Sequence, residues 1–117
     1  FLIRNSHFDL YYLYSSTKPD YPWNDWNCVL RHKHNNKWYA LVMEIEERKL
    51  GLDGNRVVDA LNVKCDPILI GSLWTQPGFF PAYHMNKDKW ISIILDGTVS
   101  DDEIKNLVAL SYQLTEK

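Results

Sequence analysis

The side chains of this sequence best suited to chemistry are cations, and they gather in two stretches. One is the run LRHKHNNKW at residues 30–38. The other is the run YHMNKDKW at residues 83–90, together with Lys64 of a predicted neighbouring strand. Lysine, arginine and charged histidine side chains contact phosphate oxygens in nucleic-acid complexes. The sequence therefore predicts a phosphate-contacting surface formed by Arg31, Lys33, Lys37, Lys64, His84, Lys87 and Lys89.

An ordinary solvated surface is the alternative for the first stretch. A hairpin tip is exposed and often charged, and Glu44, Glu46 and Glu47 on the adjoining strand offset part of the positive field. A few phosphate contacts give only weak binding that depends strongly on salt. We expect any binding of DNA to be of this weak kind.

A ligand pocket is a second interpretation of the run at residues 83–90. Its candidate residues are Asn62, Tyr83, Asn86 and Trp90. Histidine is a common general acid or base, and a lysine beside it can orient an anion, so His84 and Lys64 are groups suited to acid–base chemistry. However, the serines lack a motif such as GxSxG, and no base stands at a recognisable spacing from a nucleophile. We therefore expect a protein that is not an enzyme and has no cofactor, with the His84 ring bonding a backbone group at a corner.

Neither the histidines nor the cysteines have the spacing of a metal site. His32 and His34 fall on one face of a predicted strand, but a third ligand is missing. Cys28 and Cys65 lie in separate strand-like runs without CxxC spacing. We expect both thiols to be buried and reduced, as in a cytoplasmic protein, and a disulfide or redox pair is the alternative.

The composition is typical of one packed domain over residues 1–117. The chain is 45% hydrophobic and 24% charged. No apolar run approaches the roughly 20 residues that a membrane helix needs, so we expect no membrane contact. The formal net charge of −2 gives no overall attraction to nucleic acid, and such a role depends on a local patch.

Alternation of apolar and polar residues predicts an antiparallel sheet. The predicted strands span residues 26–32, 37–46, 57–65 and 90–95. Asn35 and Asn36 suit a tight hairpin turn, because asparagine tolerates positive φ. Along the second strand one face is expected to carry Tyr39, Leu41, Met43 and Ile45.

Two helices are predicted after the third strand. Asp66 followed by Pro67 is a good helix start, and the helix is expected to end near Gln76. Its predicted buried residues are Leu69, Ile70, Leu73 and Trp74. Residues 79–85 are expected to be extended and 86–89 to form a turn. Ser100 and Glu103 form a capping box for the last helix, whose predicted inner face is Ile104, Leu107, Val108, Ser111 and Leu114.

Residues 1–20 have a less certain structure. A helix over Ser6–Ser16 competes with a strand in the same run, and prolines at 19 and 22 predict a loop over residues 17–24. The chain begins with Phe1, which suggests a C-terminal domain or fragment of a longer protein with an upstream domain. Exposed aromatic residues in this segment would form a surface for a protein partner.

The order of motifs resembles that of the MmcQ/YjbR family of small bacterial proteins. The resemblance runs from residue 21 to residue 117, through the motifs YPW, LRHKHNNKWYALV, LNVKCDP, YHMNKDKW, IILDGTVSDDEI and SYQLT. It implies an α+β fold, with helices packed on one face of an antiparallel sheet in two layers, likened to a double-wing DNA-binding architecture. The segment before residue 21 and the long stretch 46–59 depart from the family pattern.

These observations favour a DNA-binding domain that uses the basic hairpin and corner residues. The alternative is a non-catalytic domain of a longer regulator that binds a small ligand or a protein. The oligomeric state is not predicted by any of these patterns.

Overall fold

The computed structural model describes residues 27–117. The helix predicted over residues 6–16 and the loop predicted over residues 17–24 lie outside the described residues. The predicted strand at 26–32 is described from Asn27 onward.

A five-stranded antiparallel sheet organises this part of the chain. Its strands are Cys28–Arg31 (β1), Trp38–Glu46 (β2), Val57–Lys64 (β3), Phe79–Pro81 (β4) and Trp90–Ile94 (β5). They lie in the order β1-β2-β3-β5-β4. A 3-10 helix, Glu47–Leu50 (η1), follows β2, and two α-helices complete the fold, Pro67–Leu73 (α2) and Asp101–Thr115 (α3).

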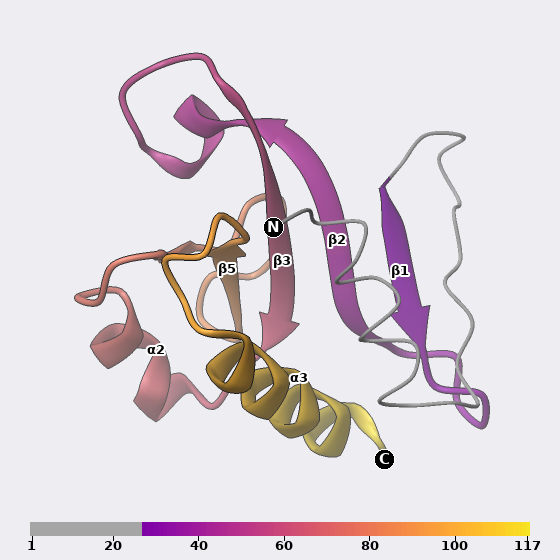
Figure 1. Ribbon diagram of the computed structural model, residues 1–117. Helices are drawn as coiled ribbons and strands as arrows, with labels where there is room; N and C mark the ends of the chain where they lie inside the picture. Colours follow the sequence, from indigo (N-terminus) through magenta and orange to yellow (C-terminus); the bar gives the residue numbers. More distant parts are fainter. Residues whose placement is uncertain (1–26) are drawn as a thin grey trace.

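Both α-helices pack toward one face of the sheet, here called the helix face. Figure 1 shows α3 crossing the ends of β2 and β3 and α2 lying beside it. Leu61 and Val63 of β3 join Ile91 and Ile93 of β5 and Val108 of α3 in one buried cluster. The prediction of an α+β fold with helices on one face of an antiparallel sheet is therefore confirmed.

The opposite face of the sheet, here called the second face, is also apolar. Leu41, Met43, Ala60 and Ile94 form a separate buried cluster there, to which η1 contributes Leu50. Tyr83, Met85 and Trp38 pack against this cluster and are only partly buried. Asn62 and Lys64 of β3 alternate with Leu61 and Val63 and therefore also lie on this second face.

The predicted orientation of Tyr39, on the same face of β2 as Leu41 and Met43, is wrong because Tyr39 forms a β-bulge. Leu30 pairs with Ala40 while Arg31 pairs with Trp38, so Tyr39 is an extra residue in the ladder. Its side chain turns to the helix face, away from Leu41 and Met43. Ser111 of α3 stabilises the bulge, since its hydroxyl donates to the Tyr39 carbonyl (2.6 Å) and accepts from the Lys64 N–H (2.9 Å).

The predicted hairpin turn is confirmed. Asn36 has φ of 62°, the left-handed conformation that asparagine tolerates. The amide of Asn36 donates to the His32 carbonyl at 2.9 Å, and the Asn35 side-chain oxygen accepts from the Lys37 amide at 2.9 Å. The loop 33–36 is thus closed by its own asparagines.

Two other boundaries differ from prediction. α2 ends at Leu73 rather than Gln76, because the amides of Thr75 and Gln76 bond carbonyls three residues back and tighten the chain. Its predicted inner face is also partly wrong, since Leu69 and Trp74 are exposed. The chain predicted to be extended over 79–85 leaves the sheet after Pro81.

α3 begins as predicted. The Ser100 hydroxyl accepts from the Glu103 amide at 3.2 Å. Ile104, Val108 and Ser111 are buried on its inner face, but Leu114 is 39% exposed. Thr115 is buried in its place, next to the hairpin described below.

Candidate functional site

The basic hairpin lies against the carboxyl end of α3, which the sequence did not predict. His32 is buried, and its Nε2 lies 2.7 Å from the Thr115 hydroxyl. The Asn35 side-chain amide donates to the carbonyls of Thr115, Glu116 and Lys117 at 3.1–3.2 Å. His34 Nε2 also contacts the Glu116 carbonyl, and the Lys37 ammonium donates to the Lys117 carbonyl.

These contacts complete the end of a helix. The last carbonyls of a helix have no partner within it and carry the negative end of its dipole. The hairpin supplies donors and positive charge at that point. Lys37, predicted to contact phosphate, instead bonds a backbone carbonyl, while Lys33 stays exposed at the tip. The hairpin therefore fixes the end of α3, and we call residues 32–37 the hairpin latch.

Removing the central donor of the hairpin latch should loosen this end of α3. We expect Asn35→Ala to lower the free energy of unfolding by about 1 kcal/mol, the usual effect of a lost helix cap. Urea unfolding followed by tryptophan fluorescence measures the change. Asn36→Gly is the matched control, because glycine adopts positive φ at no steric cost and should be nearly neutral. Equal effects of the two substitutions contradict the latch.

Arg31 has a different environment from the rest of the hairpin. Leu30 faces the helices, so alternation places Arg31 on the second face. Its guanidinium carbon lies 5.4 Å from the ring centroid of Trp38, its cross-strand partner. This distance is that of a cation–π contact. Of the predicted hairpin cations, Arg31 is the one directed to the second face beside an aromatic ring.

A second pair of a cation and a tryptophan lies on the neighbouring strands β3 and β5. Lys64 is the cross-strand partner of Trp90. Their neighbours Val63 and Ile91 face the helices, so Lys64 and Trp90 lie on the second face. All four side chains are half-buried. Four adjacent strands thus carry the cation–aromatic row, defined as Arg31, Trp38, Lys64 and Trp90, over about 14 Å at the usual strand spacing.

Asn62, predicted to line a pocket, instead supports the backbone beside it. Asn62 and Ser92 are cross-strand partners, and both are fully buried. The Asn62 amide donates to the Tyr83 carbonyl at 3.0 Å, and the Tyr83 amide donates to the Ser92 hydroxyl at 3.0 Å. The Ser92 hydroxyl in turn donates to the Asn62 side-chain oxygen. This pair draws the chain away from β4 and creates a corner at residues 82–85.

His84 stands at the tip of this corner. Its φ is 60°, an uncommon conformation for a residue with a side chain. Its ring is exposed and lies against the Tyr83 ring, with centroids 3.9 Å apart and planes tilted by 45°. The ring contact that the structure gives His84 is thus with Tyr83, whereas the sequence predicted a bond from the ring to a backbone group.

The rest of the predicted corner is a tight turn before β5. The Asn86 carbonyl accepts from the amides of Lys89 and Trp90, and the Asn86 side chain accepts from the Asp88 amide at 2.9 Å. Asn86 therefore fixes the turn rather than lining a pocket. Lys87 and Lys89 are exposed on it.

An open groove of about 500 Å³ lies between β2 and this corner. Trp38, Leu41 and Met43 form one side, and Tyr83, His84 and Met85 form the other. Of the predicted site residues, Tyr83 and His84 lie along the groove, and Trp90 and Lys64 lie in the cation–aromatic row. Trp38 was missed by the sequence argument, although its place directly after a basic turn was a signal.

Glu46 and Glu47 lie far from the cation–aromatic row. Glu46 pairs with Arg48 at 3.2 Å, and Glu47 pairs with Arg56 at 3.3 Å. Both pairs lie at the far end of β2, about 26 Å from Trp38 at the usual rise per residue. Glu46 and Glu47 are therefore too distant to offset the charge of Arg31.

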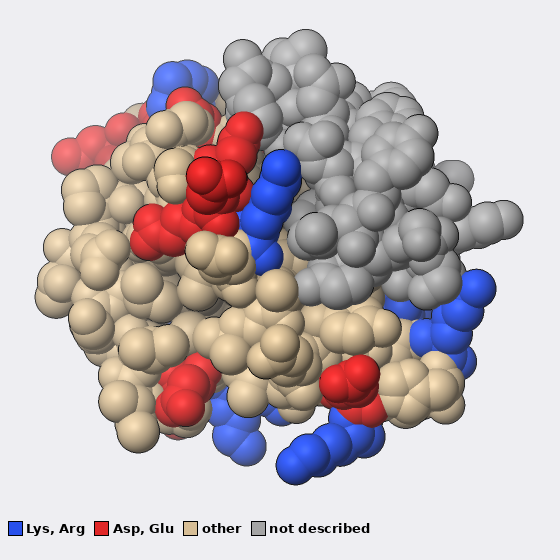
Figure 2. All heavy atoms as spheres, turned by 60° about the horizontal axis from the view of Figure 1, so that its bottom comes forward, with Lys and Arg blue, Asp and Glu red and all other residues tan. Residues whose placement is uncertain are grey.

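The face of the molecule in Figure 2 shows no continuous basic surface among the described residues. Lysine and arginine side chains are scattered there between acidic ones. Net attraction of an anionic polymer to that face is therefore weak.

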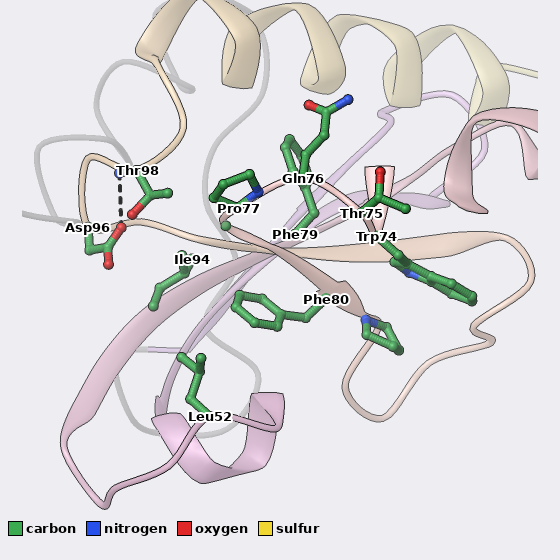
Figure 3. A pocket seen from close by; sticks show the side chains of 12 residues that line it. Leu52, Trp74, Thr75, Gln76, Pro77, Phe79, Phe80, Ile94, Asp96 and Thr98 are labelled. Atoms are coloured by element: carbon green, nitrogen blue, oxygen red, sulfur yellow. Dashed lines mark hydrogen bonds between the residues drawn. The ribbon is translucent and has the colours of Figure 1, made fainter. Parts of the chain in front are cut away.

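A second cavity, of about 570 Å³, lies along the edge strand β4. Figure 3 shows Phe80, Leu52 and Ile94 on one side of the strand and Phe79 on the other. The charged residue of its lining is Asp96, whose side chain accepts from the Thr98 amide at 3.0 Å. None of the predicted site residues lines this cavity, and its carboxylate would repel phosphate.

Cysteine and metal chemistry receive no support from the described part of the chain. Cys28 and Cys65 are both buried, and burial raises the pKa of the Cys65 thiol. Residues 27–117 contain no group of three or more potential metal ligands. Over the same residues, no helix has the length and apolar content that a membrane crossing requires.

Comparison with known proteins decides the family. The sequence profile of the family described as YjbR matches residues 14–114. This chain belongs to the YjbR family. The match begins slightly before the region in which the motifs pointed to the family, and it covers most of the chain.

Relatives of this YjbR-family chain include curated proteins and solved structures. The uncharacterised protein YyaQ of Bacillus subtilis is 45% identical over 102 residues, which cover 86% of each chain. YjbR of Escherichia coli, also uncharacterised, is 33% identical over 91 residues, 77% of this chain and 68% of that protein.

Two solved structures share the fold. A Pseudomonas syringae protein, determined by crystallography, has 44% identity and a TM-score of 0.89, covering 96% of this chain and 97% of its own. A Deinococcus radiodurans protein of domain family DUF419 has 26% identity and a TM-score of 0.72, covering 94% and 78%. The fold of the YjbR family is thus present in this chain.

Proposed function

We propose that this YjbR-family chain binds nucleic acid on the second face of its sheet, at the cation–aromatic row. The observation that supports this is the alternation of Arg31, Trp38, Lys64 and Trp90 across four adjacent strands. Aromatic rings stack on bases of any sequence, and cations beside them contact the phosphates. Lys87 and Lys89, exposed on the turn before β5, extend the positive charge.

The proposal revises which of the predicted cations take part. Lys37 is engaged at the end of α3, so the tip of the hairpin contributes less than its charge suggests. Arg31 and Lys64 come from different strands, with β2 between them, and lie toward the same end of the sheet. The basic residues of the sequence alone favour the hairpin tip instead, and the variants below separate the hairpin tip from the cation–aromatic row.

The test is a titration of labelled oligonucleotides followed by fluorescence anisotropy at low and at moderate salt. We expect Arg31→Ala and Lys64→Ala each to weaken binding about fivefold to tenfold. Each should also reduce the slope of log affinity against log salt by about 0.7 for a single strand. These changes follow because each substitution removes a cation from the cation–aromatic row.

Lys105→Ala is the matched control, since Lys105 is exposed on α3, which packs on the helix face. It should leave both affinity and slope unchanged. Lys33→Ala and Lys37→Ala report on the hairpin tip. The proposal fails if the oligonucleotides give no signal at low salt, or if only the tip variants weaken binding.

A protein-interaction domain is the second candidate. The observation that favours it is the exposure of apolar side chains on and after α2, where Ile68 is 86% exposed, Leu69 43% and Trp74 41%. Isolated exposed apolar residues are common, but three in one short segment suggest a contact surface. The absence of oligonucleotide binding in the titration would make this candidate the better supported one.

A further inference from the structure

The groove beside the cation–aromatic row has the features of a site for a flat, neutral group. Its volume of about 500 Å³ is in the range of small-molecule sites. Leu41 and Met43, 7% and 6% exposed, form an apolar floor. Trp38 stands on one side, and the paired rings of Tyr83 and His84 stand on the other. Lining of this kind favours an aromatic ligand that carries no charge of its own.

Positive charge lies at the rim of the groove rather than inside it. The guanidinium of Arg31 is over the ring of Trp38, one of the lining residues. Lys64 and Trp90 follow on the neighbouring strands. A ligand that fits both parts has an aromatic ring joined to an anionic group. A nucleotide within a strand has this combination, with the base in the groove and its phosphates at the rim.

Two buried polar side chains support the corner that forms the second wall of the groove. Asn62 donates to the Tyr83 carbonyl, and Ser92 accepts from the Tyr83 amide. Both Asn62 and Ser92 are fully buried. This support holds His84 at φ of 60°, with its ring beside the groove. Strained backbone that is held by buried polar groups occurs often at binding sites. A rigid wall also lowers the entropy lost when a ligand is sandwiched.

We propose that the groove receives one unpaired base, held between Trp38 and the Tyr83–His84 pair, and that the chain therefore prefers single-stranded nucleic acid. The inference rests on the proposed function and narrows its substrate class. In a duplex each base is stacked and paired, so entry into the groove requires that the base first leave the helix. Single strands present their bases without that cost.

The experiment compares a short single-stranded oligodeoxynucleotide with the same strand annealed to its complement. Anisotropy gives both affinities, and a strand carrying aminopurine, a fluorescent base analogue, reports stacking through quenching. We expect tighter binding of the single strand and quenching on addition of protein. His84→Asn should weaken single-strand binding by about fivefold or more, because it removes one ring of the wall.

Asparagine is chosen at position 84 because it tolerates positive φ, so the corner is retained. Trp38→Ala should have a larger effect, and circular dichroism checks that its fold is kept. One result would overturn base binding in the groove while the proposed function stands. In that result the single strand and the duplex bind with equal, salt-dependent affinity, and binding is lost in Arg31→Ala but unchanged in His84→Asn. Absence of binding to both forms at low salt overturns the two together.

Discussion

Asn62→Ala is expected to lower the free energy of unfolding by about 3 kcal/mol and to abolish oligonucleotide binding. Asn62 is fully buried, and its side chain bonds the Tyr83 carbonyl and the Ser92 hydroxyl. Substitution leaves two polar groups without these partners in a dry site, and each such loss costs ~1–3 kcal/mol. Urea unfolding gives the stability, and the anisotropy titration gives the binding.

The loss of binding should exceed what unfolding explains. Without Asn62 the corner at residues 82–85 loses one of its two side-chain supports, so the Tyr83–His84 wall of the groove moves. Asn86→Ala is the control, because its side chain bonds only the exposed Asp88 amide within a turn. It should cost about 1 kcal/mol or less. A folded Asn62→Ala variant that binds as tightly as the wild type would contradict the role of the corner.

The sheet could be predicted from the sequence because its signals are local. Alternating residues marked β2 and β3, and two asparagines marked the turn between β1 and β2. The bulge at Tyr39 was missed because it depends on Ser111, which lies 72 residues away in the sequence. A strict alternation assigns Tyr39 to the wrong face and gives no indication that Trp38 lines a groove.

The candidate site was predicted only in part, for a similar reason. The pattern singled out the run at residues 83–90 because polar groups gather there without an amphipathic period, and Tyr83 and His84 of this run line the groove. It could not separate Asn62 and Asn86, which support the backbone, from Tyr83 and His84, which line the groove. Lys37 was expected to contact phosphate because its partner in the structure, the end of α3, lies 80 residues further along the chain and leaves no local signal.

The hairpin latch contains a buried histidine, and its removal should be costly. The His32 ring is 1% exposed and lies 4.2 Å from the Tyr112 ring and 5.2 Å from the Tyr39 ring, centroid to centroid. We expect His32→Ala to lower the free energy of unfolding by about 3–4 kcal/mol, as for other buried rings replaced by alanine. His32→Phe keeps the ring packing and loses the Thr115 bond, so it should cost about 1 kcal/mol.

His32 should also make the fold sensitive to acid. The Thr115 hydroxyl donates to the Ser111 carbonyl at 2.8 Å, so it accepts from His32 Nε2. A second proton would occupy His32 Nδ1, which has no hydrogen-bond partner among residues 27–117. Burial lowers the pKa of His32 most, and the charge of His34 lowers it further, whereas Glu116 and the Tyr112 backbone raise it by less and Lys37 has the smallest effect. The unfolded chain therefore takes up this proton first, and stability falls as the pH drops below about 6.5.

Urea unfolding at about pH 8 and about pH 5 tests this dependence, in a range above the titration of ordinary carboxyl groups. The wild type should lose stability toward pH 5, whereas His32→Phe should lose distinctly less. His84→Asn removes an exposed histidine outside the hairpin latch and should retain the wild-type dependence. An unchanged dependence in His32→Phe would show that another group titrates, because the substitution removes the buried imidazole and keeps the aromatic packing that closes the latch on α3.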